Sequence, residues 1–149
     1  MELKNKRIIV TGGSDGIGRH ICLKLAAVGT RLAILGRDAD RLAAVEAECV
    51  AAGASEAIGI ACDVQNPDAI SGAVEQVTAA FGGLDILINN AGIWHKTGPL
   101  DEIPPQLLQA TVQTNLTGLM QITQAAIPAL RANDEGIILN VVSKSGVVA

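Results

Sequence analysis

Aromatic residues are nearly missing from this sequence of 149 residues, which holds one tryptophan, one phenylalanine and no tyrosine. Hydrophobic residues still make up 49% and charged residues 17%, so the chain can bury enough apolar surface to fold, and disorder is disfavoured. The interior must then be filled by alanine, isoleucine, leucine and valine. That composition suits a parallel sheet whose two faces are covered by helices.

Long runs of lysine or arginine are also missing, and the formal net charge is −4. Such a chain has no electrostatic footprint for nucleic acid or for an anionic membrane, so we expect neither as a partner. No apolar stretch approaches the roughly eighteen residues that a membrane span needs, and the N-terminal segment carries charge but no apolar signal core. We therefore expect a cytoplasmic protein.

The three cysteines, Cys22, Cys49 and Cys62, are odd in number and show no paired metal-ligand spacing. Reduced and buried thiols are the expectation, and we predict neither a disulfide nor a metal site. Repeats, low-complexity tracts and linkers are absent as well. The length therefore fits one domain, spanning residues 1–149, with one sizeable core.

Short apolar runs bounded by Gly, Asp or Asn alternate with segments whose apolar residues recur every three or four positions. The runs predict buried strands at 7–10, 32–35, 57–61, 86–88 and 137–142. The periodic segments predict helices at 17–28, 39–52, 67–81 and 104–130. Asn66 before Pro67 is a helix start signal, and Gly29, Gly53 and Gly82 are stop signals where periodic segments end.

No hairpin signal separates these elements. Strands that alternate with helices run parallel and are joined by right-handed crossovers. The sequence therefore predicts an α/β fold, with a Rossmann-like, doubly wound parallel sheet of strand order 3-2-1-4-5.

A glycine-rich turn follows the first strand and leads directly into a helix; it reads Thr11-Gly12-Gly13-Ser14-Asp15-Gly16-Ile17-Gly18. Gly12 can turn the chain sharply, Gly16 lets the backbone approach a phosphate, and Gly18 lets the helix pack close to the strand. A pyrophosphate would lie at the helix N-terminus, where free N–H groups favour an anion. An ordinary glycine-rich turn is the alternative, but the position at the start of a βαβ unit favours dinucleotide binding.

The spacing Thr-Gly-x-x-x-Gly-Ile-Gly resembles the cofactor motif of the short-chain dehydrogenase/reductase family. Four further landmarks match that family in the same order: Asp63-Val64, Asn89-Asn90-Ala91-Gly92, Asn115 and Ser143. The resemblance covers essentially the whole chain. It implies an oxidoreductase that transfers a hydride between NADP(H) and a small carbonyl or alcohol substrate, and a homo-oligomer when the enzyme is complete.

The end of the second strand indicates which dinucleotide is bound, because the adenosine ribose lies there. Gly36 stands where NAD-preferring members of the family place an acid, and Arg37 follows it. A guanidinium can pair with a 2′-phosphate, so we expect NADP(H) rather than NAD(H). Two features oppose this: Asp38 could neutralise Arg37, and Asp15 stands where many NADP-binding relatives carry a basic residue. The alternative for Arg37 is a solvated surface charge.

The resemblance assigns cofactor contacts to a set of residues spread along the chain. They are Gly12, Ser14, Asp15, Gly16, Ile17, Gly18, Arg37, Asp63, Val64, Asn89, Ala91, Gly92 and Val112. Asp63 would accept a hydrogen bond from the adenine amino group, and its alternative is a turn aspartate before Pro67. Val112 would line the adenine site, and its alternative is core packing.

Two residues are candidates for catalysis. Asn115 lies among poor helix formers in the middle of a predicted helix, a cluster that costs about 1 kcal/mol or more relative to alanine. The resemblance implies that Asn115 occupies a kink and holds a water that relays protons, with an exposed polar side chain as the alternative. Ser143, three residues before Gly146, would hydrogen-bond the substrate carbonyl, and ordinary turn chemistry is its alternative.

The family takes its proton donor from a Tyr-x-x-x-Lys motif beyond the serine, but this sequence has no tyrosine. We therefore expect a chain cut from a longer enzyme, with negligible turnover of its own because it lacks the general acid. A catalytically silent NADP(H)-binding or regulatory module is the alternative. A third possibility is a structural partner that binds no nucleotide.

Overall fold

The structure is a computed structural model that describes residues 2–94, 98–133 and 135–143. Within these residues the strands are β1 (Arg7–Thr11), β2 (Arg31–Gly36), β3 (Glu56–Ala61), β4 (Ile86–Asn89) and β5 (Ile137–Asn140). They form one sheet of order β3-β2-β1-β4-β5, and every neighbouring pair is parallel. The predicted Rossmann-like sheet and its strand order are confirmed.

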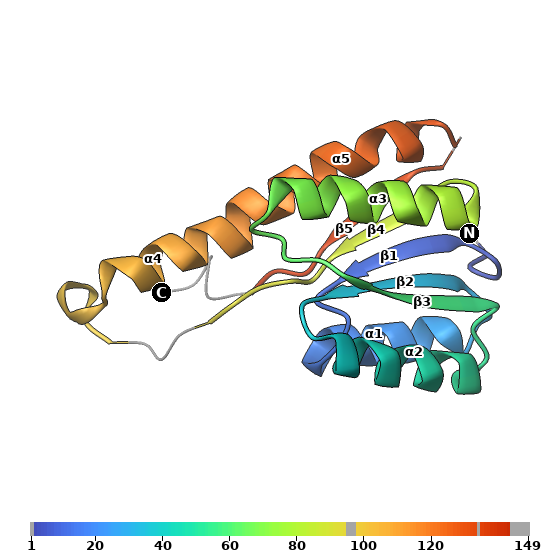
Figure 1. The fold of residues 1–149 in the computed structure, drawn as a ribbon, viewed down its shortest axis with the longest axis horizontal. Helices are drawn as coiled ribbons and strands as arrows, with labels where there is room; N and C mark the ends of the chain where they lie inside the picture. Colours follow the sequence, from blue (N-terminus) through green and yellow to red (C-terminus); the bar gives the residue numbers. More distant parts are fainter. Residues whose placement is uncertain (1, 95–97, 134, 144–149) are drawn as a thin grey trace.

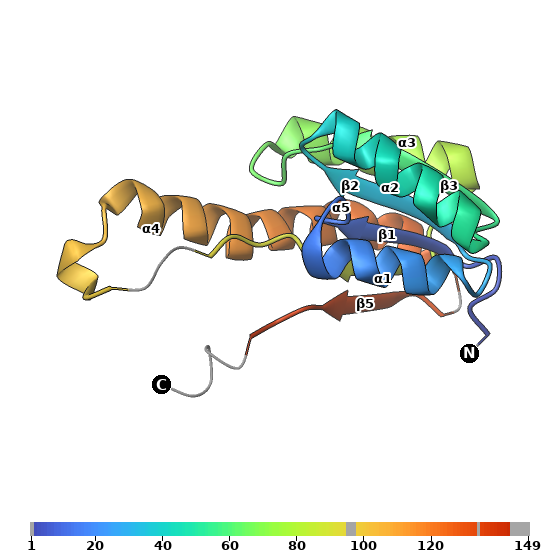
Figure 2. The ribbon, with the colours of Figure 1, turned by 90° about the horizontal axis from the view of Figure 1, so that it is seen from below.

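Helices cover both faces of this sheet. They are α1 (Gly16–Ala26), α2 (Ala39–Ala52), α3 (Pro67–Phe81), the short 3₁₀ turn η1 (Leu100–Glu102), α4 (Pro105–Val112), the π-helical segment η2 (Gln113–Gly118) and α5 (Leu119–Arg131). Helices α1 and α2 lie on one face, and α3 and α5 lie on the other (Figure 1). Helix α4 projects past the carboxyl ends of the strands, away from the sheet (Figures 1 and 2).

Local signals explain where the helices begin and end. The side chains of Asp15, Asp38 and Asn66 cap the first turns of α1, α2 and α3, each by accepting a hydrogen bond from a backbone N–H group. Gly53 and Gly82 end α2 and α3 in the left-handed conformation, with φ of 109° and 72°. The predicted start at Asn66 and the predicted stops at both glycines are confirmed.

The core consists of two apolar layers, one on each face of the sheet. Along β1, Ile8 and Val10 pack with the residues under α1 and α2, whereas Ile9 packs with those under α3 and α5. This alternation follows from the two-residue period of a strand. Both layers are built almost wholly from aliphatic side chains, and Phe81 is the one aromatic ring in them. The central strands β1, β2 and β4 are therefore buried on both faces, as the composition predicted, whereas the edge strand β5 is largely exposed.

All three cysteines are free and buried. Cys22 and Cys49 meet between α1 and α2, where the hydrogen bond with Cys49 and burial together raise the pKa of the Cys22 thiol. In the described part of the chain, no cluster of three His, Cys, Asp or Glu side chains is placed to hold a metal ion.

The predicted helix at 104–130 is not one regular α-helix. Its middle widens into the π-helical segment η2, which contains Asn115 and ends at Gly118. A Cβ at Gly118 would overlap the backbone carbonyl of Val64, so this turn packs directly on the chain that follows β3. The predicted fifth strand also ends earlier than expected, at Asn140. The π-helical turn is thus in contact with a part of the chain that is distant in sequence.

A search of the described residues for membrane spans finds no helix with the length and hydropathy to cross a bilayer.

Candidate functional site

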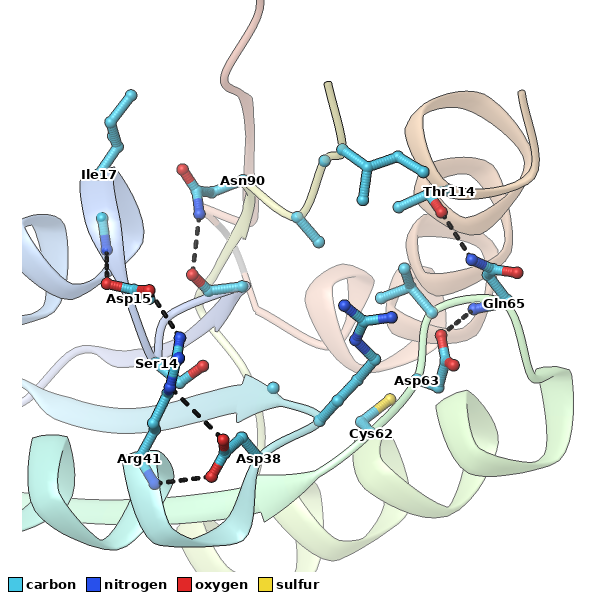
Figure 3. Close-up of a pocket in the computed structure, with 18 residues that line it drawn as sticks. Ser14, Asp15, Ile17, Asp38, Arg41, Cys62, Asp63, Gln65, Asn90 and Thr114 are labelled. Carbon is cyan, nitrogen blue, oxygen red and sulfur yellow. Dashed lines mark hydrogen bonds and ion pairs between the residues drawn. The ribbon is translucent and has the colours of Figure 1, made fainter. Parts of the chain in front are cut away.

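A cleft of about 950 Å³ opens at the carboxyl ends of the strands. The chain runs outward from β1 to β2 and β3 and then returns to β4 on the other side of β1, so the connections after β1 and β4 diverge. Ligands of open α/β sheets bind at such a switch point. The cleft is lined by Gly12, Ser14, Asp15, Gly16, Ile17, Gly36, Arg37, Asp38, Arg41, Cys62, Asp63, Val64, Gln65, Asn90, Ala91, Gly92, Ile93 and Thr114 (Figure 3).

The floor of the cleft is a tight junction between the end of β1 and the end of β4. Thr11 Oγ1 accepts hydrogen bonds from the backbone N–H groups of Asn90 and Ala91, both at 2.9 Å. Asn90 Nδ2 donates to the carbonyl oxygens of Thr11 and Gly12, at 3.0 and 3.1 Å. Gly12 has φ of 63°, and a Cβ there would lie 2.9 Å from the Cα of Ala91. The first glycine therefore permits both the turn and the close approach of β4.

The N-terminus of α1 forms one wall of the cleft. Asp15 Oδ1 accepts a hydrogen bond from the Gly16 N–H group at 2.7 Å, and the Asp15 carbonyl accepts one from Arg19 at 3.1 Å. The amides of Ile17 and Gly18 lie between these two and take part in neither contact. Gly16 has φ of 51°, and a Cβ there would meet no atom within 4 Å.

This open corner fits the pyrophosphate of a dinucleotide. The first N–H groups of a helix have no partner inside the helix, and with the dipole they attract an anion. The space above Gly16 leaves room for phosphate oxygens. Gly18 is buried below, and a Cβ there would overlap the carbonyl of Gly12, so it lets α1 start directly against the turn.

The end of β2 carries the charged part of the cleft. Asp38 is committed to Arg41 in its own helix, because Oδ1 accepts from the Arg41 N–H group at 3.1 Å and Oδ2 lies 3.4 Å from Arg41 Nε. Among the described residues, Arg37 makes no ion pair. Gly36 lies against Ser14, since a Cβ at Gly36 would be 2.7 Å from Ser14 Oγ. Asp38 therefore does not neutralise Arg37 in this arrangement.

The segment after β3 forms the opposite wall. Asp63 Oδ1 accepts from the Gln65 N–H group at 2.9 Å, which is turn chemistry, while Asp63 also lines the cleft. Gln65 Nε2 donates to Thr114 Oγ1 at 2.9 Å and links this wall to η2 (Figure 3). Burial, with the nearby Asp63 carboxylate, raises the pKa of the Cys62 thiol to about 11. The Cys62 thiol is therefore protonated at neutral pH.

Asn115 contributes to the far end of the cleft indirectly, by holding Ile93 in place. Its Oδ1 accepts from the Ile93 N–H group at 2.8 Å, and its Nδ2 donates to the Ile93 carbonyl at 2.9 Å. Ile93 lines the cleft, whereas Asn115 does not. The side chain therefore holds the segment after β4 against the π-helical turn.

Ten of the predicted cofactor residues come together around this cleft. They are Gly12, Ser14, Asp15, Gly16, Ile17, Arg37, Asp63, Val64, Ala91 and Gly92.

Gly18, Asn89 and Val112 lie outside the cleft lining. Gly18 is buried beneath the turn, and Asn89, with 3% of its surface exposed, donates to Thr123 and Asn140 on the side of α5. Successive residues of a strand point to opposite sides, so Asn90 and not Asn89 lines the cleft. Val112 is 55% exposed on the projecting helix and is therefore not a core residue either. Ser143, after β5, is exposed and also lies outside the lining.

The sequence-based prediction did not assign a cofactor contact to several lining residues. They are Gly36, Asp38, Arg41, Cys62, Gln65, Asn90, Ile93 and Thr114. Asn90 could have been found from the strand alternation that buries Asn89. Arg41 had no local signal, because its place depends on how α2 packs beside α1.

The comparisons with known proteins cover almost the whole chain. A family model described as short chain dehydrogenase matches residues 6–149. D-beta-hydroxybutyrate dehydrogenase of Cupriavidus necator is 37% identical over 149 residues, which cover 99% of this chain and 56% of that protein. The chain spans about half the length of the curated relatives that it matches.

Solved structures agree with the sheet and its helices. A short chain dehydrogenase from Burkholderia cenocepacia, in complex with NADP, is 40% identical with a TM-score of 0.91, and the match covers 100% of this chain and 60% of that one. An NAD⁺-bound xylitol dehydrogenase is 31% identical with a TM-score of 0.95, over 100% of this chain and 57% of that one. The family model, the relative and the two structures lead to one conclusion: this chain belongs to the short-chain dehydrogenase family.

Proposed function

We propose that this chain is the dinucleotide-binding part of an oxidoreductase that transfers a hydride between NADP(H) and a small carbonyl or alcohol substrate. The observation that carries the proposal is that one cleft joins the open N-terminus of α1 to Arg37, a cation without an ion pair among the described residues. A dinucleotide with a 2′-phosphate requires an anion-binding helix end for its pyrophosphate and a cation at the end of β2, where its adenosine ribose would lie. We call the end of the cleft at Gly36 and Arg37 its ribose end.

Each wall of the cleft has a role in holding this cofactor. The amides around Gly16 would hold the pyrophosphate, and Arg37 would pair with the 2′-phosphate. Asp63 would accept a hydrogen bond from the adenine amino group. Ala91 and Gly92 let the backbone approach the ribose and the nicotinamide, because their side chains are small.

The bound NADP(H) supplies or accepts the hydride in this chemistry. Ser143 would donate a hydrogen bond to the substrate carbonyl and fix its position. Asn115 holds Ile93 and with it the segment that would lie beside the nicotinamide. The homo-oligomer that we expect for the functional protein is supported by exposed apolar side chains along the long helix, among them Leu116 and Met120.

One observation favours a second function, namely NADP(H) binding without turnover. The chain contains no tyrosine, so the residue that donates the proton in the family's chemistry has no counterpart in these 149 residues. We therefore expect these residues alone to bind NADPH and to reduce carbonyl compounds at a negligible rate.

A fluorescence titration with NADPH, paired with a turnover assay on a panel of ketones and aldehydes, tests both functions. NADPH binding supports both functions, and measurable turnover by these 149 residues would exclude the silent module. Unchanged NADPH fluorescence together with unchanged thermal stability would overturn both. Arg37→Asp must weaken NADPH binding by about tenfold or more and affect NADH less, since only NADPH carries the 2′-phosphate.

A further inference from the structure

Arg41 connects the N-terminus of α1, beside the proposed pyrophosphate corner, to the N-terminus of α2, at the end of β2. Its Nη1 lies 2.7 Å from Asp15 Oδ2, and its Nε lies 3.4 Å from Asp38 Oδ2. Figure 3 shows the guanidinium between these two carboxylates, at the edge of the cleft. The first carboxylate precedes α1 and the second precedes α2.

Each of these aspartates divides its carboxylate between two tasks. Asp15 caps α1 through Oδ1 on the Gly16 N–H group, and Asp38 caps α2 through Oδ1 on the Arg41 N–H group. The second oxygen of each faces the Arg41 guanidinium. Because capping fixes both carboxylates, they also fix the place of the guanidinium in the cleft wall.

The corner is nevertheless exposed to solvent. Of the side-chain surface, 59% is exposed for Arg41, 73% for Asp15 and 52% for Asp38. Exposed ion pairs are weak, so a doubly charged phosphate can compete with the carboxylates for the guanidinium. The five donors of a guanidinium also allow it to bind a phosphate without leaving a carboxylate.

We propose that Arg41 is a second determinant of cofactor specificity, which binds the 2′-phosphate of NADP(H) together with Arg37 and is opposed by Asp15. This inference rests on the proposed function, because it assumes that the ribose end of the cleft holds a 2′-phosphate. Asp15 stands where many NADP-binding relatives carry a base, and here Arg41 reaches the same corner from α2 and supplies the positive charge from another element.

The proposal gives the two residues opposite effects on NADPH binding. Arg41→Gln removes a cation and must weaken NADPH binding by about fivefold or more, with NADH changed by less than about twofold. Asp15→Asn keeps an oxygen to cap α1 but removes the opposing charge, so it must tighten NADPH binding by about threefold. NADH binding must tighten less than NADPH binding in this variant, because NADH has the pyrophosphate but lacks the 2′-phosphate.

The matched control is Arg19→Gln. Arg19 joins the same two helices through Glu48, with Nε at 2.7 Å from Oε2, but neither residue lines the cleft. If Arg41 only ties α1 to α2, the Arg19 and Arg41 variants must lower thermal stability alike and leave the ratio of NADPH to NADH affinity unchanged. That result would overturn the proposal.

The experiment measures dissociation constants by titration calorimetry for NADPH, NADH, 2′,5′-ADP and 5′-AMP, with the wild-type chain and the variants at two salt concentrations. The proposal expects Arg41→Gln to weaken 2′,5′-ADP and NADPH alone and to reduce the salt dependence of their binding. If Arg37→Asp removes the preference for 2′-phosphate and Arg41→Gln does not, the proposal for Arg41 fails while the proposed function stands. If the wild-type chain binds none of the four ligands, the proposed function fails and this inference with it.

Discussion

Asn115 holds the backbone of Ile93 with both halves of its amide, accepting at 2.8 Å and donating at 2.9 Å, as a neighbouring strand would. The contact joins a π-helical turn to the segment that leaves β4. The Asn115 side chain can reach the Ile93 backbone in this way because it lies on the widened, π-helical turn. The residue that costs helix stability thus fixes one end of the cleft.

Asn115→Leu should remove both hydrogen bonds while keeping the side-chain volume. We expect a loss of about 1 kcal/mol in unfolding free energy, since each exposed hydrogen bond contributes little net stability. NADPH binding should weaken several-fold, while binding of 2′,5′-ADP, which lacks the nicotinamide half, stays constant. Urea denaturation and ligand titration measure the two effects. Gln124→Leu, on the exposed side of α5, is the control and should change neither.

Gly36→Asp tests the packing at the ribose end. An aspartate at position 36 introduces the acid that NAD-binding relatives use, but its Cβ would lie 2.7 Å from Ser14 Oγ. The single variant should therefore lose NADPH binding without gaining NADH affinity, and its melting temperature should fall. Adding Ser14→Gly removes the obstacle, so the double variant should bind NADH more tightly than the single one. Equal NADH affinity of both variants would show that Ser14 does not constrain this position.

Asp85 and Arg7 form a largely buried ion pair at the opposite end of the sheet. Asp85 Oδ1 lies 2.8 Å from Arg7 Nη2, and Oδ2 accepts from the Arg7 N–H group and from Nε at 2.8 and 2.9 Å. The hydrogen bonds from Arg7 hold the pKa of the Asp85 carboxyl below its usual value. This ion pair links the amino end of β1 to the turn before β4.

The lowered pKa fixes the direction of a pH effect on stability. An aspartate in the unfolded chain has a pKa of about 3.9. The stabilisation by Asp85 is therefore complete above that pH, and it is lost as the pH falls through the lower pKa of the folded state. Asp85→Asn should cost about 2 kcal/mol at pH 7, because it leaves a largely buried guanidinium without its charge partner. Its unfolding free energy should then depend less on pH below 4 than that of the wild type.

Thermal or urea unfolding between pH 2 and 7 measures this difference. Asp101→Asn, in the exposed turn η1, is the matched control and should follow the wild-type profile. A parallel pH profile for the Asp85 and wild-type proteins would contradict the role of the ion pair.

The fold could be predicted because its signals are local. Apolar runs, the N-cap at Asn66 and the glycines that end α2 and α3 act within a few residues, and together they define a parallel sheet. Apolar periodicity alone could not locate the break in the long helix, because the contacts made there are with Val64 and Ile93, which are distant in sequence. The resemblance to the family implied a kink at Asn115, and Asn115 lies in the π-helical segment. A pattern of poor helix formers around Asn115 indicated the region but not the π-helical turn.

The candidate site divides in the same way. The glycine-rich turn specifies its own geometry, so Gly12, Gly16 and their neighbours were predicted together and lie together. Side chains that depend on the direction of a strand end or on the packing of two helices were not predicted, as with Asn90 and Arg41. Both become visible once the register of β4 and the position of α2 are known.

We propose above all that the N-terminus of α1 cradles the phosphates of NADP(H). The most direct test is an NMR titration of the ¹⁵N-labelled chain with NADPH, followed at the backbone amides. We expect the largest shifts at Gly16, Ile17 and Gly18, accompanied by Arg37, with Arg131 at the end of α5 unchanged. Saturating NADPH that leaves the amides of this turn unmoved, or that shifts Arg131 instead, would contradict it.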